Sequence, residues 1–168
     1  MRNRAGHKLT CLMLAMFVLS AATAAGHGDK GHAEDPMALH MQAMYALKEQ
    51  IPGEYRIMER SPLLPTEQSL ARGREAFARH CQVCHGPGGH GDGPAAKGLP
   101  TPPANFLDVK HSAIYGPGEK FWIIGNGSGA TDMPAYPHLD LRTRWDLVNY
   151  IYHLQEEAAK PQQNHHHH

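Results

Sequence analysis

Two cysteines and a histidine stand at a spacing that can hold a redox cofactor or a metal. They belong to the segment Cys81-Gln82-Val83-Cys84-His85. This C-x-x-C-H spacing is typical of c-type haem attachment, because two thiols three positions apart can each form a thioether with one haem vinyl group. The next imidazole is then delivered to the iron as its proximal ligand. The segment therefore predicts one covalent haem c, bound by Cys81, Cys84 and His85.

Two other chemistries use paired cysteines. A zinc site needs a second cysteine pair or a spaced histidine pair downstream, and the sequence offers neither. A thioredoxin-type dithiol belongs near a βαβ pattern, whereas the apolar spacing of this chain indicates helices and loops only. Haem attachment is therefore favoured over both alternatives.

The first 24 residues predict a signal peptide. Three basic residues precede an apolar run at 12–19, and small residues at 22–24 suit a signal peptidase. The alternative is an uncleaved membrane anchor, for which the apolar run is short. We expect a mature protein that begins near Ala25, lies in the periplasm and has no stable insertion in the membrane. Cleavage also removes Cys11, so that Cys81 and Cys84 are the only thiols left in an exported protein.

The charge balance limits the kinds of partner. Cleavage removes three of the 16 basic residues and none of the 16 acidic ones, which leaves a formal charge of −3 with the histidines neutral. Such a near balance argues against nucleic acid or anionic lipid as the partner.

Apolar residues at helical spacing, together with capping residues, predict the regular elements. Helices are expected over residues 36–50, from about 67 to 80, over 119–124 and over 142–154. Asp35 is the expected N-cap of the first helix, with Met37, Met41, Met44 and Tyr45 on one face. Prolines predict an extended path over residues 54–66, and glycines and prolines break the chain from 86 to 105.

The order of these features resembles the class I cytochrome c family over about residues 67–156. The resemblance is carried by a helix with Gly73 and Phe77, the haem motif, a glycine-rich loop, the segment Met133-Pro134-Ala135-Tyr136, and a closing helix with Trp145 and Tyr150. It implies an all-α fold in which a small domain of about four short helices, residues 67–157, wraps around one covalent haem. Residues 25–66 would form an N-terminal extension, and residues 158–168 a disordered tail that ends in histidines.

The resemblance also implies roles for individual residues. Met133 would be the distal iron ligand opposite His85, and the carbonyl of Pro94 would hold the proximal imidazole. His111 and His138 are the alternatives to Met133 and would make a bis-histidine haem of lower potential. A distal site left open for a small ligand is the remaining possibility.

The resemblance further implies a contact between the first and last helices of the domain. Gly73 and Phe77 would pack against Leu147 and Tyr150, with the glycine allowing close approach. The segments Gly91-Asp92-Gly93-Pro94 and Pro103-Ala104-Asn105-Phe106 look like those of bacterial periplasmic members, some of which lie beside copper-handling or respiratory systems.

These features predict a one-electron carrier that serves periplasmic or membrane-bound redox proteins, is a monomer and is not an enzyme. A haem-based sensor or catalyst with an open distal site is the first alternative. A copper-handling protein is the second, because thioethers and imidazoles suit Cu(I). Its candidate ligands are Met37, Met41, Met44, His40, His27 and His32. A methionine stripe at helical spacing more often packs against a core or a partner.

Overall fold

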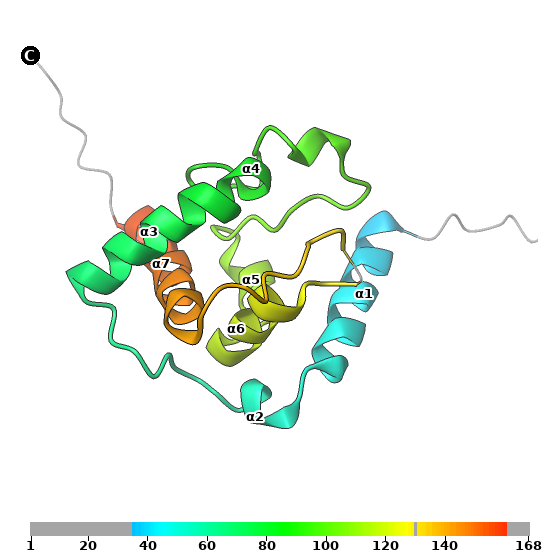
Figure 1. The fold of residues 1–168 in the computed structure, drawn as a ribbon. Coiled ribbons are helices and arrows are strands. Elements are labelled where there is room, and N and C mark those ends of the chain that lie inside the picture. The colour runs from blue at the N-terminus through cyan, green and yellow to red at the C-terminus, as the bar shows by residue number, and fades with distance from the viewer. Residues whose placement is uncertain (1–34, 130, 161–168) are drawn as a thin grey trace, which may run out of the picture. The chain divides into compact units, whose positions relative to one another are not determined.

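The structure is a computed structural model that describes residues 35–129 and 131–160. The predicted signal peptide, His27, His32 and the terminal histidines lie outside the described residues. Within them the elements are α1 (Pro36–Gln50), α2 (Gly53–Arg56), α3 (Glu67–His80), α4 (Gln82–His85), the 3₁₀ helix η1 (Ala96–Gly98), α5 (Val109–Ser112), α6 (Pro117–Asn126) and α7 (Leu141–Ala159) (Figure 1). The described residues contain no strand beyond an isolated bridge between Ser128 and Met133. The prediction of an all-α fold is confirmed.

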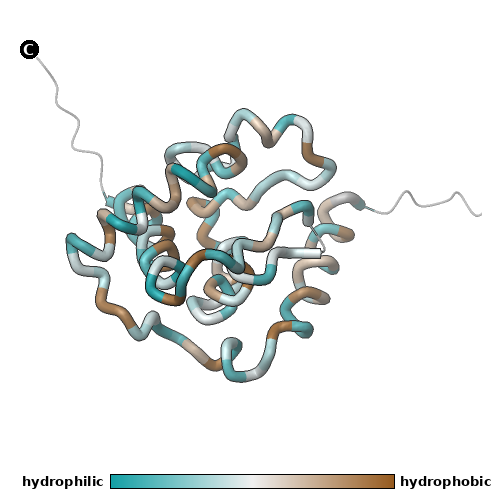
Figure 2. Tube along the Cα trace, viewed as in Figure 1, coloured by the Kyte–Doolittle hydropathy of each residue, from teal (hydrophilic) through white to brown (hydrophobic). Residues whose placement is uncertain are grey.

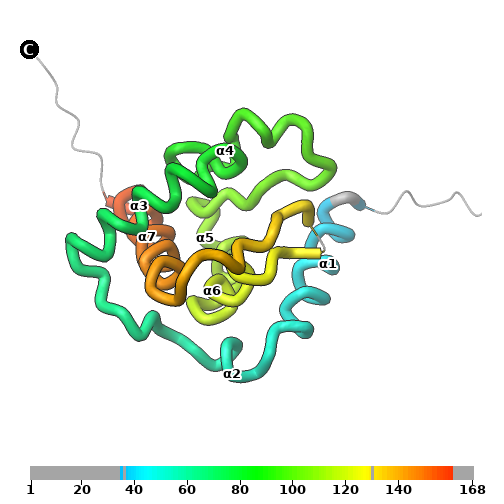
Figure 3. The backbone as a smooth tube through the Cα atoms, viewed as in Figure 1, coloured from blue at the N-terminus to red at the C-terminus, as the bar shows by residue number. Residues whose placement is uncertain are grey.

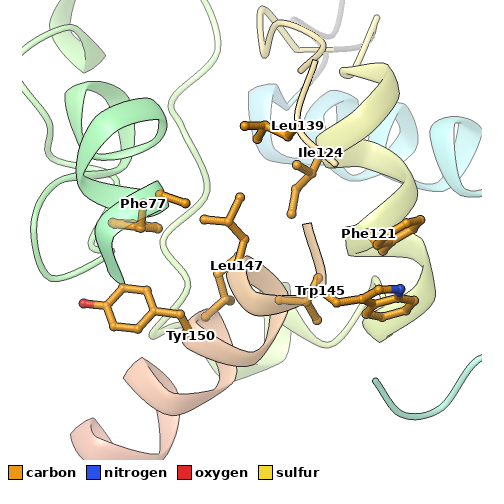
Figure 4. Close-up of a cluster of buried hydrophobic side chains, with 10 residues drawn as sticks. Phe77, Phe121, Ile124, Leu139, Trp145, Leu147 and Tyr150 are labelled. Carbon is orange, nitrogen blue, oxygen red and sulfur yellow. The ribbon is translucent and has the colours of Figure 1, made fainter. Parts of the chain in front are cut away.

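The crossing of α3 and α7 forms the centre of the core. A Cβ atom on Gly73 would lie 2.2 Å from the carbonyl oxygen of Asp146 and 2.8 Å from the Cβ atom of Tyr150, so only glycine permits this approach. The rings of Phe77 and Tyr150 meet edge to face with centroids 5.4 Å apart, and Leu147 is fully buried (Figure 4). The predicted contact between these two helices is confirmed.

Helix α6 covers the other side of this core. Phe121 of α6 stacks on Trp145 of α7 with ring centroids 4.3 Å apart, and Ile124 lies in the same cluster (Figure 4). Both helices are longer than the apolar spacing predicted. Helix α7 begins at residue 141 because the carboxylate of Asp140 accepts a hydrogen bond from the backbone N–H of Thr143 at 2.7 Å.

A polar network is buried between α3 and α7, and the sequence analysis did not predict it. Asp146 has no exposed surface and accepts hydrogen bonds from the hydroxyl of Ser69 and from Nε of Arg72, each at 2.6 Å. Asn149 donates to Ser69 at 3.0 Å and to the carbonyl of Leu63 at 3.1 Å. The second bond ties to α7 the connection between α2 and α3, whose path can be followed in Figure 3.

Helix α1 starts at its predicted N-cap. The side chain of Asp35 accepts a hydrogen bond from the backbone N–H of Met37 at 3.0 Å. The other end of the helix is buried. Leu47 in its last turn and Ile51, the residue directly after the helix, pack against Ile123 of α6. The expected extended path begins only at residue 57, since residues 53–56 form the short helix α2.

Only part of the apolar face predicted for α1 is buried. Met41 and Met44 are half-buried, whereas Met37 and Tyr45 expose 54% and 53% of their surface; Leu47, which was not among these residues, exposes 5%. Figure 2 shows hydrophobic residues spread along α1 between polar ones. No helix in the described part of the chain is both long and apolar enough to cross a membrane.

Candidate haem site

The end of α3 positions the two cysteines of the motif. Cys81 is the C-cap of α3, and its backbone N–H donates to the carbonyl of Phe77 at 2.9 Å. The carbonyl of Cys81 then accepts from the N–H of His85 at 2.9 Å, which closes the turn of α4. Neither Cys81 nor Cys84 is in a disulfide. Burial, reinforced by neighbouring Cys84, raises the pKa of the Cys81 thiol to about 12.

The ring of His85 is held in one orientation. Its Nδ1 lies 3.0 Å from the carbonyl oxygen of Ala104, and its face stacks on the ring of Phe106 with centroids 4.6 Å apart. His85 is 9% exposed, and this desolvation lowers its pKa, although the bond to Ala104 acts in the opposite direction. A neutral ring that donates through Nδ1 keeps the lone pair of Nε2 free for a metal.

The prediction that Pro94 supplies the carbonyl for this ring is wrong in this structure. The acceptor is Ala104, ten residues further along the chain. The backbone N–H groups on either side of Pro94 donate to carbonyls of the motif at 3.0 and 2.9 Å. This part of the loop therefore binds the backbone of the motif, and the later segment at 103–106 reaches the imidazole.

The glycines after the motif are required by this close packing. A Cβ atom on Gly93 would lie 2.4 Å from the carbonyl oxygen of Val83. Gly91 has φ = 76° and donates its N–H to the carbonyl of His85 at 2.8 Å, and a Cβ atom there would lie 2.5 Å from the carbonyl oxygen of Pro103. Both segments that flank His85 are therefore fixed by positions that accept only glycine without distortion.

The segment 133–136 lies beside the motif. The hydroxyl of Tyr136 donates to the carbonyl of His80 at 2.8 Å, and its backbone N–H donates to the carbonyl of Ile124 at 3.0 Å. The pKa of Tyr136 is raised by burial first and then by the nearby thiols of Cys81 and Cys84. One aromatic residue thus joins α6 to the end of α3, directly before the first cysteine.

Met133 lies three residues before this tyrosine and is half-buried. It packs against the α3–α7 core and also against the smaller cluster of Leu47, Ile51 and Ile123. Its carbonyl accepts from the N–H of Ser128 at 3.0 Å. A loop methionine is therefore held between two apolar clusters without being enclosed by either.

The two histidines considered as alternatives make other contacts. His138 is exposed, and its ring lies against those of His80 and Tyr136, with centroids 5.6 and 6.0 Å away. The Nδ1 atom of His111 pairs with a carboxylate oxygen of Asp108 at 2.9 Å.

These residues fit a covalent haem. Two free thiols stand three positions apart, and a buried imidazole that is held through Nδ1 follows them directly. A thioether is available on the nearby loop. Sequence reasoning missed the contacts of Ala104 and Phe106 with the imidazole, although it had noted their segment for its resemblance to bacterial periplasmic cytochromes.

Comparison with known proteins identifies the class. Residues 68–151, half of the 168-residue chain, match the family described as cytochrome c oxidase, cbb3-type, subunit III. The chain belongs to this cytochrome c family. No curated protein matches it. Among solved structures, it is similar to a chain of the reducing HAO-like protein complex of Kuenenia stuttgartiensis, with 28% identity and a TM-score of 0.48. That match covers 55% of this chain and 46% of the other, so it spans less than half of that protein.

Membership of the family has direct chemical consequences. A cytochrome c domain binds haem and transfers electrons, and such domains typically carry electrons rather than catalyse reactions. The family implies covalent haem c, with which the spacing of Cys81 and Cys84 is consistent.

Proposed function

We propose that this protein is a periplasmic, single-haem cytochrome that passes one electron at a time between redox partners. The observation that carries the proposal is the position of His85, oriented by Ala104 and placed directly after two free thiols. Cys81 and Cys84 would form the thioethers, and His85 would bind the iron through Nε2. The bound haem would supply one reversible electron step.

Met133 is the proposed second iron ligand. Its segment is tied to the end of α3, directly before the motif, through the bond from Tyr136 to His80, and its side chain lies half-buried on a loop between two apolar clusters. A neutral thioether opposite a neutral imidazole favours the reduced state and raises the potential. His138 is exposed and its ring lies against those of His80 and Tyr136, which supports Met133 over it.

The surface at the motif suits brief docking. Val83 lies between the two cysteines and exposes 51% of its surface. An apolar contact so close to the thioethers would let a partner approach the haem without a large interface, which favours fast release. We propose periplasmic or membrane-bound redox proteins as the partners and a monomer as the working form.

The test is the visible and near-infrared spectrum of the full chain made with the c-type haem maturation system. We expect covalent haem and, in the oxidised protein, the sulfur-to-iron band of a methionine ligand. The band should be lost in Met133→Ala and kept in Met58→Ala, which truncates another half-buried methionine packed against the core. His138→Ala should keep it as well.

Two results would contradict the proposal at different levels. A covalent haem without the methionine band overturns the ligand assignment and favours a bis-histidine haem or a ligand-binding sensor. Absence of covalent haem overturns the proposed function itself.

A further inference from the structure

Helix α1 brings a histidine of the N-terminal extension next to one from the middle of the chain. The ring centroids of His40 and His111 lie 6.0 Å apart, with the planes tilted by 44°. The position of α1 is set by other contacts, because the Tyr115 hydroxyl donates to the carbonyl of Met44 at 2.8 Å and Lys48 donates to the Glu119 carboxylate at 3.1 Å. The two imidazoles therefore meet within an anchored interface.

His111 is oriented as a metal-binding histidine is. Its Nδ1 lies 2.9 Å from Oδ2 of Asp108, and Oδ1 of the same carboxylate accepts from the backbone N–H of His111 at 3.3 Å. A ring that donates through Nδ1 carries its free lone pair on Nε2, which is the carboxylate–histidine arrangement common in metal sites. Asp108 thus fixes both the ring nitrogen that stays free and the direction in which it points.

The free nitrogen has no partner in the described part of the chain. Nε2 of His111 is buried and makes no hydrogen bond there. A buried polar atom without a partner is destabilising, so its presence needs a reason. An imidazole nitrogen binds a metal at about 2.0–2.1 Å, so two rings that share one ion have centroids roughly 5–6.5 Å apart. The separation of His40 and His111 falls in this range.

Two thioethers stand at positions of α1 that share a face with His40. Met37 lies three residues before His40 and Met44 four residues after it, so both share its face of α1. Met37 exposes 54% of its surface, and burial therefore does not explain it. No group of three or more His, Cys, Asp or Glu that could hold a metal occurs among the described residues. Two imidazoles completed by thioethers select Cu(I) rather than zinc or a hard cation.

We propose that His40, His111, Met37 and Met44 form a Cu(I) site separate from the haem, with Asp108 as a positioning residue for His111. The site joins the N-terminal extension to the cytochrome domain. It uses a part of the chain that the proposed electron-carrier function leaves unused.

The experiment is a competitive Cu(I) titration of the full-length haem protein against a chromophoric Cu(I) chelator under anaerobic reduction. Asp108→Asn should weaken Cu(I) binding by roughly 10–100-fold, because it removes an outer-sphere partner. His40→Ala and His111→Ala should weaken it more. His153→Ala is the matched control, since its Nδ1 also faces a carboxylate, that of Glu157 at 3.8 Å, but Tyr150 provides the neighbouring ring. This control should bind Cu(I) as tightly as the unaltered protein does. It shows whether removing a histidine elsewhere in the chain changes Cu(I) affinity.

The thioether ligands have their own readout. X-ray absorption at the copper edge should show nitrogen and sulfur neighbours, and the sulfur contribution should fall in Met37→Leu and Met44→Leu. Because Met37 is exposed, Met37→Leu should fold normally and keeps the test valid if a histidine variant does not fold. Three results would each overturn the proposal: Cu(I) affinity in His40→Ala and His111→Ala equal to that of the unaltered protein, copper with nitrogen neighbours only, or tighter binding of Zn(II) than of Cu(I). The haem spectrum of each variant reports on the proposed function independently.

Discussion

The Nδ1 atom of His85 lies 3.0 Å from the carbonyl oxygen of Ala104, and the backbone between them folds back through three glycines with positive φ, at 86, 89 and 91. A hydrogen bond from Nδ1–H makes the imidazole a more basic ligand. A more basic ligand stabilises oxidised iron, so this contact should lower the reduction potential relative to an unbonded imidazole.

Gly91→Ala tests this relationship. The added Cβ atom would meet the carbonyl oxygen of Pro103 at 2.5 Å in a left-handed conformation, so the segment carrying Ala104 must shift. We expect a higher reduction potential by redox titration, because the carbonyl then accepts less strongly from His85. Gly98→Ala is the control, since a Cβ atom there has nothing within 4 Å. An unchanged potential in folded Gly91→Ala would contradict the role assigned to Ala104.

Gly73→Ala should destabilise the fold through the α3–α7 crossing. Its Cβ atom would lie 2.2 Å from the carbonyl oxygen of Asp146, a backbone atom that cannot turn away as a side chain can. Forcing the helices apart should lower the free energy of unfolding by about 1–3 kcal/mol, the usual range for overpacking. Guanidinium unfolding measures the change. Gly53→Ala, where the new methyl group has open space, should show no such loss.

The sequence predicted those parts of the structure that depend on local signals. The side-chain cap of Asp35 and the spacing of apolar residues depend only on residues a few positions apart in the sequence. The bounds of α1 and α3 were therefore predicted closely. The approach of α3 to α7 was predicted from Gly73 through the family resemblance, because so close a crossing leaves room only for glycine. The haem motif is also local, since its chemistry lies within five consecutive residues.

The parts that sequence reasoning missed depend on long-range contacts. Nothing near Pro94 or Ala104 in the sequence tells which carbonyl reaches His85, because the loop between them sets that geometry. Sequence reasoning also did not identify the residue of α1 that is buried most deeply, since a methionine stripe can pack against a core or a partner. That residue is Leu47, because its end of α1 meets α6.

Lys48→Met should loosen the contact between α1 and α6. Glu119 is 1% exposed, and its Oε2 accepts from Lys48 at 3.1 Å, so the substitution leaves a buried carboxylate without its cation. Because Lys48 is itself one-third exposed, we expect a loss of roughly 1–3 kcal/mol rather than the full effect for a deeply buried pair.

The control for this prediction is the ion pair between Arg56 of α2 and Glu49 of α1, whose carboxylate is exposed. Arg56→Met removes the pair between Arg56 and Glu49, whose carboxylate is 76% exposed, and should change stability by less than about 0.5 kcal/mol. Equal effects of the two substitutions, measured by denaturant unfolding, would show that burial of Glu119 adds nothing to the interaction.

The burial of the Lys120 amine makes the stability of the fold depend on pH in alkaline solution. Its amine is buried, donates to the carbonyl of Ser112 at 2.6 Å and lies 5.1 Å from the centroid of the Tyr152 ring. Burial lowers the pKa of Lys120 from 10.5 to about 8, with Glu119 opposing the shift and Lys48 adding to it. The folded protein therefore releases the proton at a lower pH than the unfolded chain does.

The sign of the effect follows from this difference. Below about pH 8 both states hold the proton, and the penalty for burying the charge is fully present. As the pH rises from about 8 toward 10.5, the unfolded chain holds more protons than the folded one, so the free energy of unfolding increases. Above pH 10 this gain is opposed, because the pKa of Tyr115 is raised to about 12 and the folded state then loses stability with increasing pH.

Chemical unfolding of the haem protein between pH 8 and 10 therefore tests the prediction. The unaltered protein should gain stability across this window, and Lys120→Met should remove that gain because no amine remains to lose its proton there. Lys110→Met is the matched control, since Lys110 is exposed and its removal should leave the slope as it was. A slope that persists in Lys120→Met would assign the pH dependence to another group and contradict the burial argument for Lys120.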